Sequence, residues 1–278
     1  MTTPTFYVFI SVVWDCLFYR APFLSLRVLL RLLLGQSKRN LIWTKIWNPL
    51  PFHKLEYGLP LNNSMVLAIT PDGSRLLCPI YSASIIREIY FSKVYGRVFK
   101  PTKGAIVIDV GAHVGIYSVK LAKKVGKQGL IVSIEPNTFN YRLLVENIKS
   151  NGLSERVIPL NVAAGSFNGK TKLYLDSDAY SGGHSLLPIS QRWMQVRIRT
   201  LDTIMDKLEL NHCDIIKIDV EGYELEVLKG AEHTLEKTSN IVVAAYHTPT
   251  EAKKVMEFLK ARRFKVYDIN SFVYGCKE

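Results

Sequence analysis

The segment VIDVGAHVG, residues 107–115, constrains the fold more than any other part of the chain. A short apolar run leads into Asp109, glycines follow at positions 111 and 115, and a helical pattern begins directly after them. Gly111 allows the backbone to turn tightly and approach a ligand, and Gly115 allows the helix to pack closely at its start. A strand, a glycine turn and a helix in this order predict an α/β nucleotide-type site.

An acidic residue at the end of the next apolar run narrows the cofactor class. Glu135 closes the run 130–135, 24 residues after Gly111, where a carboxylate binds both hydroxyls of a ribose. The dinucleotide fingerprint requires a glycine where His113 stands, and the chain has no P-loop lysine pattern. The sequence therefore favours a nucleoside cofactor without phosphates, a description that S-adenosylmethionine fits.

Short β-branched runs alternate with helical patterns from Gly104 onward, which predicts a mostly parallel sheet with helices on both faces. Seven strands are expected in a Rossmann-like arrangement. The expected strands include 105–110, 130–135, 156–163, 215–220 and 241–246, and the expected helices are 116–124, 139–150, 223–229 and 250–261.

Two further segments interrupt or precede this alternation. The polar-alternating runs 170–175 and 195–200 flank a Ser/Gly loop, and we expect them at the edge of the sheet. Residues 65–78 read as a hairpin with Pro-Asp-Gly as its turn, and a helix is expected from Ser84 to about Tyr95.

The chain is expected to divide into an N-terminal helical segment, 1–60, and a domain, 61–278, whose Rossmann-like core begins near residue 104. The longest uncharged run at the N-terminus, Met1–Trp14, is shorter than the roughly 20 residues that cross a bilayer. The N-terminal segment contains neither a basic leader nor an A-x-A cleavage site, so a secretory signal is not expected.

The leucine-rich run after Pro22 has a basic stripe that includes Arg27 and Arg31. Two interpretations stay open for residues 1–34. The segment is either a helix lying in a membrane interface, with the basic stripe toward anionic headgroups, or a helix that covers the core domain or a partner subunit.

The charge of +12 is uneven along the chain. The first 100 residues hold 12 Lys and Arg against four acids, and the other 178 hold 24 against 20, so the expected catalytic core is not strongly basic. This distribution gives little support to a nucleic-acid substrate. The four cysteines have no metal-ligand spacing, which predicts free thiols in a reducing compartment and a cytoplasmic protein, with membrane association at the cytoplasmic face as an option.

Several motifs together resemble the FkbM family of methyltransferases, over roughly residues 75–270. The most specific is a strand ending in IDVEG with a helix ending in LKGA. The motifs are VIDVGAHVGIYS (107–118), SIEPN (133–137), LNVAAGSFNG (160–169), RTLDTI (199–204) and IIKIDVEGYELEVLKGA (215–231). The resemblance implies a Rossmann-like class I methyltransferase fold and S-adenosylmethionine as cofactor.

The resemblance also assigns residues to the cofactor. Asp109 and Gly111 would shape its amino-acid end, Glu135 would hold the ribose, and Asp219 would lie near the methyl group. His113 stands where the family often has Asn, and its backbone would still serve. The full implied cofactor set is Asp109, Gly111, His113, Gly115, Glu135, Pro136, Asn137, Asn161, Val162, Ala163 and Asp219, with 136–137 near the adenosine and 161–163 beside the adenine.

Methyl transfer from a sulfonium is an in-line displacement, so the protein has to align the acceptor and, for a hydroxyl, remove its proton. The catalytic candidates are Asp219 and Glu221 after one strand and His247 after the next, with His184 in the Ser/Gly loop as a further base. Asp219 would either act in catalysis or bind the cofactor's amino group, and Glu221 would either act in catalysis or cap a helix. A divalent metal bridging Asp219 and Glu221 stays open as an alternative, but no complete metal-ligand set is visible.

We expect the acceptor to be a sugar, glycan or other small molecule. A nucleic-acid methyltransferase is disfavoured, because IDVEGY stands where amino-methylating enzymes carry an Asn/Asp-Pro-Pro-aromatic motif and no Pro-Cys nucleophile is present. A non-catalytic nucleoside-binding module would be expected to lose the glycines or acids that are all present here. A nicotinamide oxidoreductase lacks support because the middle glycine is missing.

Overall fold

The computed structural model describes residues 47–48, 65–79, 82–92, 94–96, 98–176, 182–247 and 250–277. The chain divides into two compact units, Met1–Leu50 and Pro51–Glu278. Of the first unit only strand β1 (Trp47–Asn48) is described, so the expected helix and membrane contact of residues 1–34 lie outside the described residues. None of the described helices has the length and apolar character needed to cross a membrane.

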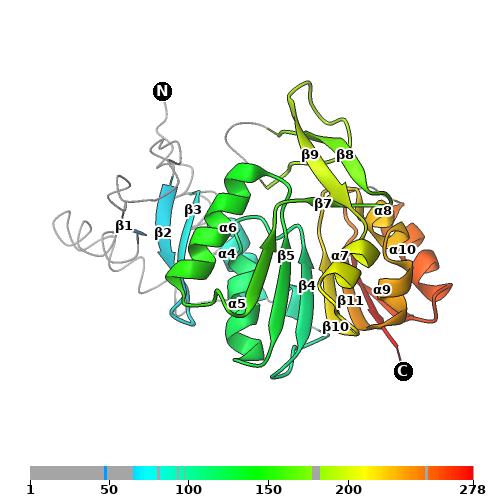
Figure 1. The fold of residues 1–278 in the computed structure, drawn as a ribbon, viewed down its shortest axis with the longest axis horizontal. Helices are drawn as coiled ribbons and strands as arrows, with labels where there is room; N and C mark the ends of the chain where they lie inside the picture. The colour runs from blue at the N-terminus through cyan, green and yellow to red at the C-terminus, as the bar shows by residue number, and fades with distance from the viewer. Residues whose placement is uncertain are drawn as a thin grey trace. The chain divides into compact units, whose positions relative to one another are not determined.

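A seven-stranded sheet forms the centre of the second unit (Figure 1). All neighbouring strands pair in parallel except at β13, which is antiparallel to both its neighbours. In spatial order the strands are β12 (Lys265–Ile269), β13 (Phe272–Cys276), β11 (Thr238–Ala244), β10 (Cys213–Ile218), β4 (Ile106–Val110), β5 (Leu130–Ile134) and β6 (Val157–Leu160). The predicted mostly parallel, Rossmann-like sheet of seven strands is confirmed.

The strand order reverses between β4 and β10, and this reversal fixes where a ligand can bind. The helices α5 (Ile116–Val125) and α6 (Thr138–Ser150) connect strands in one direction along the sheet. The helices α8 (Glu224–Lys229), α9 (Glu232–Glu236) and α10 (Glu251–Lys260) connect strands in the other direction. Because parallel crossovers are right-handed, the two sets cover opposite faces and leave a crevice at the carboxyl ends of β4 and β10.

Most of the apolar core lies between these helices and the sheet. The strand side chains alternate between the two faces and are buried on both, as in parallel sheets generally. Val107, Ile108, Ile216 and Val242, for example, are fully buried, which explains why these segments read as nearly continuous apolar runs in the sequence.

A second, three-stranded sheet contains β7 (Ala163–Ala164), β9 (Trp193–Arg199) and β8 (Gly169–Tyr174) in that order. The expectation that the two polar-alternating runs extend the edge of the main sheet was wrong. The predicted strand 156–163 ends at Leu160, and the chain then leaves the main sheet, so that Ala163 pairs with Ile198 instead. Ala163, Leu173, Val196 and Ile198 form a small hydrophobic cluster that is separate from the main core.

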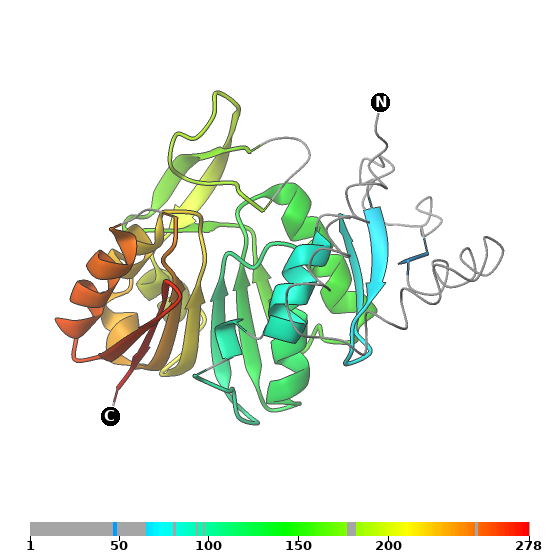
Figure 2. The same cartoon turned by 180° about the vertical axis from the view of Figure 1, so that it is seen from behind.

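The segment before the Rossmann-like core contains the predicted hairpin, β2 (Met65–Ile69) and β3 (Arg75–Pro79). The expected helix near residues 84–95 is divided into α4 (Ser82–Arg87), a π-helical turn η2 (Glu88–Ser92) and a 3₁₀ turn η3 (Val94–Gly96). Figure 2 shows the hairpin and α4 from behind. Helix α7 (Leu201–Lys207), labelled in Figure 1, follows β9.

Asn147 on α6 fastens the hairpin to the core. Its amide oxygen accepts a hydrogen bond from the Leu77 N–H at 2.6 Å. Its amide nitrogen donates to the carbonyl oxygens of Leu77, at 2.9 Å, and Val114, at 2.8 Å. Asn147 is completely buried, so the side chain satisfies backbone groups that no water reaches.

Candidate active site

The glycine turn after β4 is shaped by the neighbouring strand β10. Gly111 has a φ of +76°, and a Cβ atom at this position would lie 1.8 Å from the carbonyl oxygen of Asp219. Gly115 has a φ of +84°, and a Cβ there would lie 2.5 Å from Leu144 Cδ1 on α6. Both positions therefore favour glycine for two reasons, the positive φ and the lack of space for a side chain. Gly111 lies against the end of β10, and Gly115 lies against α6.

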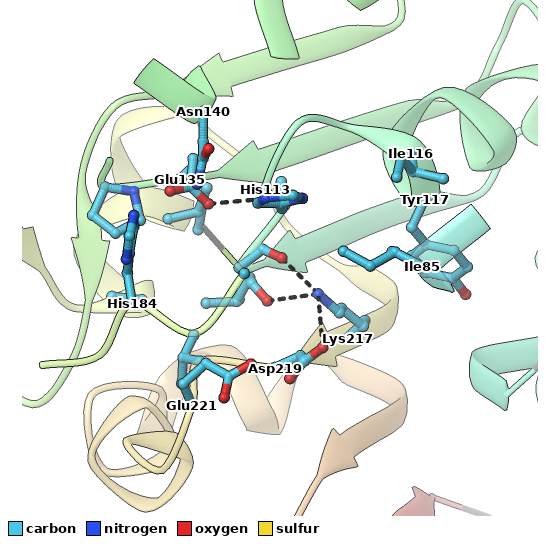
Figure 3. A pocket seen from close by; sticks show the side chains of 18 of the residues that line it. Ile85, His113, Ile116, Tyr117, Glu135, Asn140, His184, Lys217, Asp219 and Glu221 are labelled. Carbon is cyan, nitrogen blue, oxygen red and sulfur yellow. Dashed lines mark hydrogen bonds and ion pairs between the residues drawn. The ribbon is translucent and has the colours of Figure 1, made fainter. Parts of the chain in front are cut away.

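Glu135, directly after β5, is held by two backbone N–H groups. Its Oε2 accepts from His113 N and its Oε1 from Asn137 N, both at 2.9 Å. Burial raises the pKa of Glu135 to about 7, although the hydrogen bonds from Asn137 and His113 oppose the shift. Burial also lowers the pKa of His113 to about 3, so this imidazole is neutral. His113 adopts a φ of +53°, which turns its N–H toward the carboxylate (Figure 3).

Asp109 and Lys217 form a buried ion pair beneath the turn, with Nζ 3.1 Å from Oδ1. Ser118 Oγ donates to the other Asp109 oxygen at 2.6 Å. Lys217 Nζ also donates to the carbonyl oxygens of Val110 and Gly111, at 3.1 and 2.8 Å. The ion pair thus fixes the turn from within the core, and Asp109 does not itself line the cavity described below.

Asp219 follows β10 and faces Lys217 and Tyr95. Tyr95 Oη donates to Asp219 Oδ2 at 2.5 Å. Lys217 Nζ lies 4.0 Å from the same oxygen, and Figure 3 shows this ion pair. Within the described residues, the buried Asp219 Oδ1 has no hydrogen-bond partner. Tyr95 comes from η3, so a segment outside the Rossmann-like core orients this carboxylate.

These groups surround a cavity at the switch point of the sheet. Of the predicted cofactor residues it includes Gly111, His113, Glu135, Pro136, Ala163 and Asp219, and Glu221 of the predicted catalytic residues also lines it. His184 and Leu186, which precede β9, line the same cavity. The lining also includes four residues that are not among the predicted site residues: Ile85, Glu88, Tyr95 and Lys217.

The other predicted cofactor residues lie behind the lining. Asn137 is the N-cap of α6, where its side chain accepts from the N–H groups of Phe139 and Asn140. Asn161 donates to the carbonyl oxygens of Glu135 and Pro136, at 2.9 and 3.0 Å. Gly115 and Val162 are likewise outside the lining. The structure gives Asn137 and Asn161 supporting contacts that hold the loop after β5.

His247, after β11, is surrounded by carboxylates rather than placed in the cavity wall. Its Nε2 lies 3.2 Å from Glu221 Oε2 and 3.9 Å from Asp219 Oδ1. Its Nδ1 lies 3.3 Å from Glu224 Oε1 and 3.6 Å from Glu251 Oε2. Burial alone would lower the pKa of His247, but Glu221, Glu224 and Glu251 outweigh it and raise the pKa to about 12. With no other cation bound, the ring is therefore an imidazolium at neutral pH.

The charge of the lining suits a cationic cofactor. Among the described residues, the cavity wall carries the carboxyl groups of Glu88, Glu135, Asp219 and Glu221 against one ammonium, that of Lys217. S-adenosylmethionine carries a sulfonium and an ammonium against one carboxylate, and its ribose diol matches a carboxylate acceptor such as Glu135. The residues present therefore fit this cofactor in charge and in donor chemistry.

A seven-stranded sheet of this order, with a glycine turn and an acidic residue at its switch point, defines the Rossmann-like class I methyltransferase fold. The model of the methyltransferase FkbM domain matches residues 109–266. The chain belongs to the FkbM methyltransferase family, which confirms the resemblance seen in the sequence. S-adenosylmethionine is the cofactor of this class.

Individual relatives are more distant. The chain is 28% identical to the hexuronic acid methyltransferase AglP of Haloferax volcanii over 154 residues, which cover 55% of this chain and 61% of AglP. It is 24% identical to the methyltransferase sdnD of Sordaria araneosa, over 66% of this chain and 82% of that one. A SAM-dependent methyltransferase structure from Aquifex aeolicus aligns with a TM-score of 0.41 at 16% identity, over 68% of this chain and 89% of the other.

Proposed function

We propose that the chain transfers a methyl group from S-adenosylmethionine to a hydroxyl of a sugar, a glycan or another small molecule. The single observation that carries this proposal is the acidic cavity at the switch point, which has Glu135 on the β5 side and Asp219 and Glu221 on the β10 side. The cofactor supplies a methyl group already activated on a sulfonium. The protein has to bind it, align the acceptor and exclude water.

On the cofactor side, Glu135 is the proposed partner of the ribose hydroxyls. Each of its oxygens already accepts one backbone N–H, which fixes the carboxylate in place and leaves acceptor capacity on both atoms. Gly111 and His113 would line the amino-acid end through their backbone. Pro136 and Ala163 would provide apolar contact for the adenine, since both line the cavity.

On the acceptor side, Glu221 is the proposed general base. As the methyl group passes from sulfur to the acceptor oxygen, the hydroxyl proton would pass to the Glu221 carboxylate, and S-adenosylhomocysteine and the methylated acceptor would leave. His247 Nε2 lies 3.2 Å from Glu221 Oε2. The neighbouring carboxylates raise the pKa of His247 to about 12, so the ring keeps its proton at neutral pH. It would therefore orient Glu221 rather than take the proton itself.

A uronic acid or another sugar is the acceptor class that we propose first. The name of the AglP relative, a hexuronic acid methyltransferase, supports this choice. The identity is 28% and the match spans 61% of AglP, so the acceptor has to be measured on this protein. A hydroxyl acceptor gives a methyl ether and a carboxyl acceptor gives a methyl ester, and mild alkali cleaves only the ester.

Calorimetric titration with S-adenosylmethionine and S-adenosylhomocysteine, with NAD as control, tests the cofactor. We expect micromolar binding of both sulfur nucleosides and none of NAD. Glu135→Gln should weaken binding by at least tenfold, since a charge-assisted bond contributes about 1.5–3 kcal/mol. The matched control is Glu236→Gln, because the Glu236 side chain is 77% exposed and is not part of the lining. Absence of binding by the parent protein would contradict the methyltransferase proposal and favour a non-catalytic module.

Transfer of labelled methyl to a panel of neutral and uronic acid glycosides tests the acceptor. We expect alkali-stable product with a hydroxyl-bearing sugar, and a loss of kcat of about 100-fold or more in Glu221→Gln with little change in cofactor affinity. Product that alkali releases would assign the transfer to a carboxyl group. Turnover by the Glu221→Gln variant at the parent rate would exclude Glu221 as the base.

A further inference from the structure

A cluster of four carboxylates around one imidazole lies beside the proposed cofactor cavity. Asp219 and Glu221 follow β10, Glu224 begins α8, Glu251 begins α10, and His247 follows β11. Asp219 and Glu221 also line the cavity, whereas the other three lie behind it. The cluster therefore reaches the cavity through two side chains and is otherwise enclosed by protein.

The geometry of three of these residues suits a metal ion. Asp219, Glu224 and His247 each offer one ligand atom, and these atoms all lie within 4.8 Å of one another. Two ligands at about 2.1–2.4 Å from a shared divalent ion can be at most about 4.2–4.8 Å apart. The three donors can therefore reach one ion with small side-chain movements and without a change of backbone.

Buried oxygens without hydrogen-bond partners in this cluster suit a cation as their ligand. Glu224 is completely buried, and its Oε1 is fixed by the N–H groups of Val220, at 2.9 Å, and Gly222, at 3.3 Å. Within the described part of the chain, Glu224 Oε2, Asp219 Oδ1 and both ring nitrogens of His247 have no partner in hydrogen-bonding geometry. Orphaned acceptors at such depth are costly unless a ligand satisfies them.

The local charge supports the same conclusion. One imidazolium opposes four carboxylates. Lys217 Nζ lies 4.0 Å from Asp219 Oδ2, but it is closer to Asp109 Oδ1, at 3.1 Å. A divalent ion would neutralise this excess of negative charge.

We propose that Asp219, Glu224 and His247 bind one divalent cation of the Mn²⁺ or Mg²⁺ type. A donor set dominated by carboxylates with one imidazole favours such ions over soft metals. Binding would displace the proton from the coordinating nitrogen of His247. If the proposed function holds, the ion lies next to the acceptor and would lower the pKa of its hydroxyl as a Lewis acid.

Titration of the full-length protein with Mn²⁺, in the absence of cofactor, tests the site. Loss of the free Mn²⁺ signal in electron paramagnetic resonance should give one ion per chain. Calorimetry in two buffers of different ionisation enthalpy should show release of about one proton per ion. Glu224→Gln keeps an acceptor oxygen for the Val220 and Gly222 N–H groups but removes the charge, and it should weaken Mn²⁺ binding at least tenfold.

Glu226→Gln is the matched control, because Glu226 is on the same helix but pairs with Lys229 and Ser166 away from the cluster. It should bind Mn²⁺ within twofold of the parent. Asp219→Asn serves as the second variant if Glu224→Gln does not fold, and it should also bind at least tenfold more weakly. Absence of binding at about 5 mM Mn²⁺, or equal binding by the folded variants, would overturn the proposal and leave a proton-sharing cluster. Because no cofactor is present, this result is separate from the S-adenosylhomocysteine titration.

Discussion

Single residues at the glycine turn carry constraints that come from a different strand. The carbonyl oxygen of Asp219 occupies the space that a side chain at position 111 would need. The turn after β4 can therefore pack against the end of β10 only because residue 111 has a hydrogen atom in place of Cβ. The residue that positions a cofactor loop is therefore also a packing contact of the central sheet.

Gly111→Ala should lower the free energy of unfolding by more than about 3 kcal/mol, because it adds a steric clash to the cost of a positive φ. Gly73→Ala isolates that φ cost. Gly73 has the same φ of +76°, and a Cβ there meets no atom of the described residues within 4 Å, so a loss of about 1–2 kcal/mol is expected. Urea denaturation of both variants makes the comparison. Equal losses would mean that the Asp219 carbonyl moves aside without cost.

The raised pKa of Glu135, about 7, should make cofactor binding depend on pH. The ionised carboxylate accepts two ribose hydroxyls, whereas the protonated form has less acceptor capacity. Affinity for S-adenosylhomocysteine should therefore rise between pH 5.5 and 8, by at most about tenfold per pH unit below the pKa. Calorimetry across this range measures it, and the same series on Glu135→Gln should be flat. A slope that persists in the variant would assign the titration to another group.

The contrast between Glu135 and Lys217 shows what the sequence can predict about such a site. Glu135 ends an apolar run at a fixed interval after a glycine turn, so local pattern alone indicates it. Lys217 also has a local signal, a charge inside the apolar run 215–220, but its partner Asp109 is 108 positions away and only the strand pairing of β10 with β4 brings them together. Tyr95 has no such signal, because its contact with Asp219 depends on how η3 packs.

At the scale of elements, the β2–β3 hairpin is attached to α6 by two asparagines that differ in burial. Asn147 and Asn151 both bond to the backbone of β3, at Leu77 and Arg75. The first set of hydrogen bonds is buried and the second is exposed.

Asn147→Ala should therefore lower the free energy of unfolding by about 3 kcal/mol, because it leaves buried backbone groups without partners. Asn151→Ala should cost less than about 1 kcal/mol, since water replaces the lost bonds. Hydrogen exchange of the Leu77 amide, with thermal unfolding of both variants, checks the difference. Similar costs for the two would show that the hairpin detaches readily and is not fastened by Asn147.

The small sheet shows where pattern reasoning about elements fails. Alternating polar and apolar residues in 170–175 and 195–200 correctly indicate half-exposed strands, and β8 and β9 lie there. The pattern does not say which sheet they join. That depends on two residues, Ala163 and Ala164, which pair with β9 after the chain has left β6, and a two-residue strand gives no periodic signal.

For the molecule as a whole, the described residues that line the cavity and the N-terminal segment occupy different parts of the sequence. All the described residues that line the cavity lie between Ile85 and Tyr246. We propose that the domain begins near residue 61 and that the preceding segment has another role, such as contact with a membrane or a partner.

Removal of residues 1–60 should accordingly leave the affinity for S-adenosylhomocysteine within threefold of the full chain. Removal of residues 1–97 eliminates the hairpin and Tyr95, and it should reduce both stability and binding. Calorimetry and thermal unfolding of the two shortened proteins test this division. A large loss of binding in the first would show that the N-terminal segment supports the cavity.

The antiparallel strand β13 has a consequence for how the chain is made. It follows β12 in the sequence but lies between β12 and β11 in the sheet. During translation, β12 therefore leaves the ribosome before β13, the strand that pairs with it. Until β13 has been made, one edge of β11 stays unpaired. Loss of residues 272–276 would remove an interior strand, and the edges of β11 and β12 would then be unpaired and open to chaperones or to other unfinished chains.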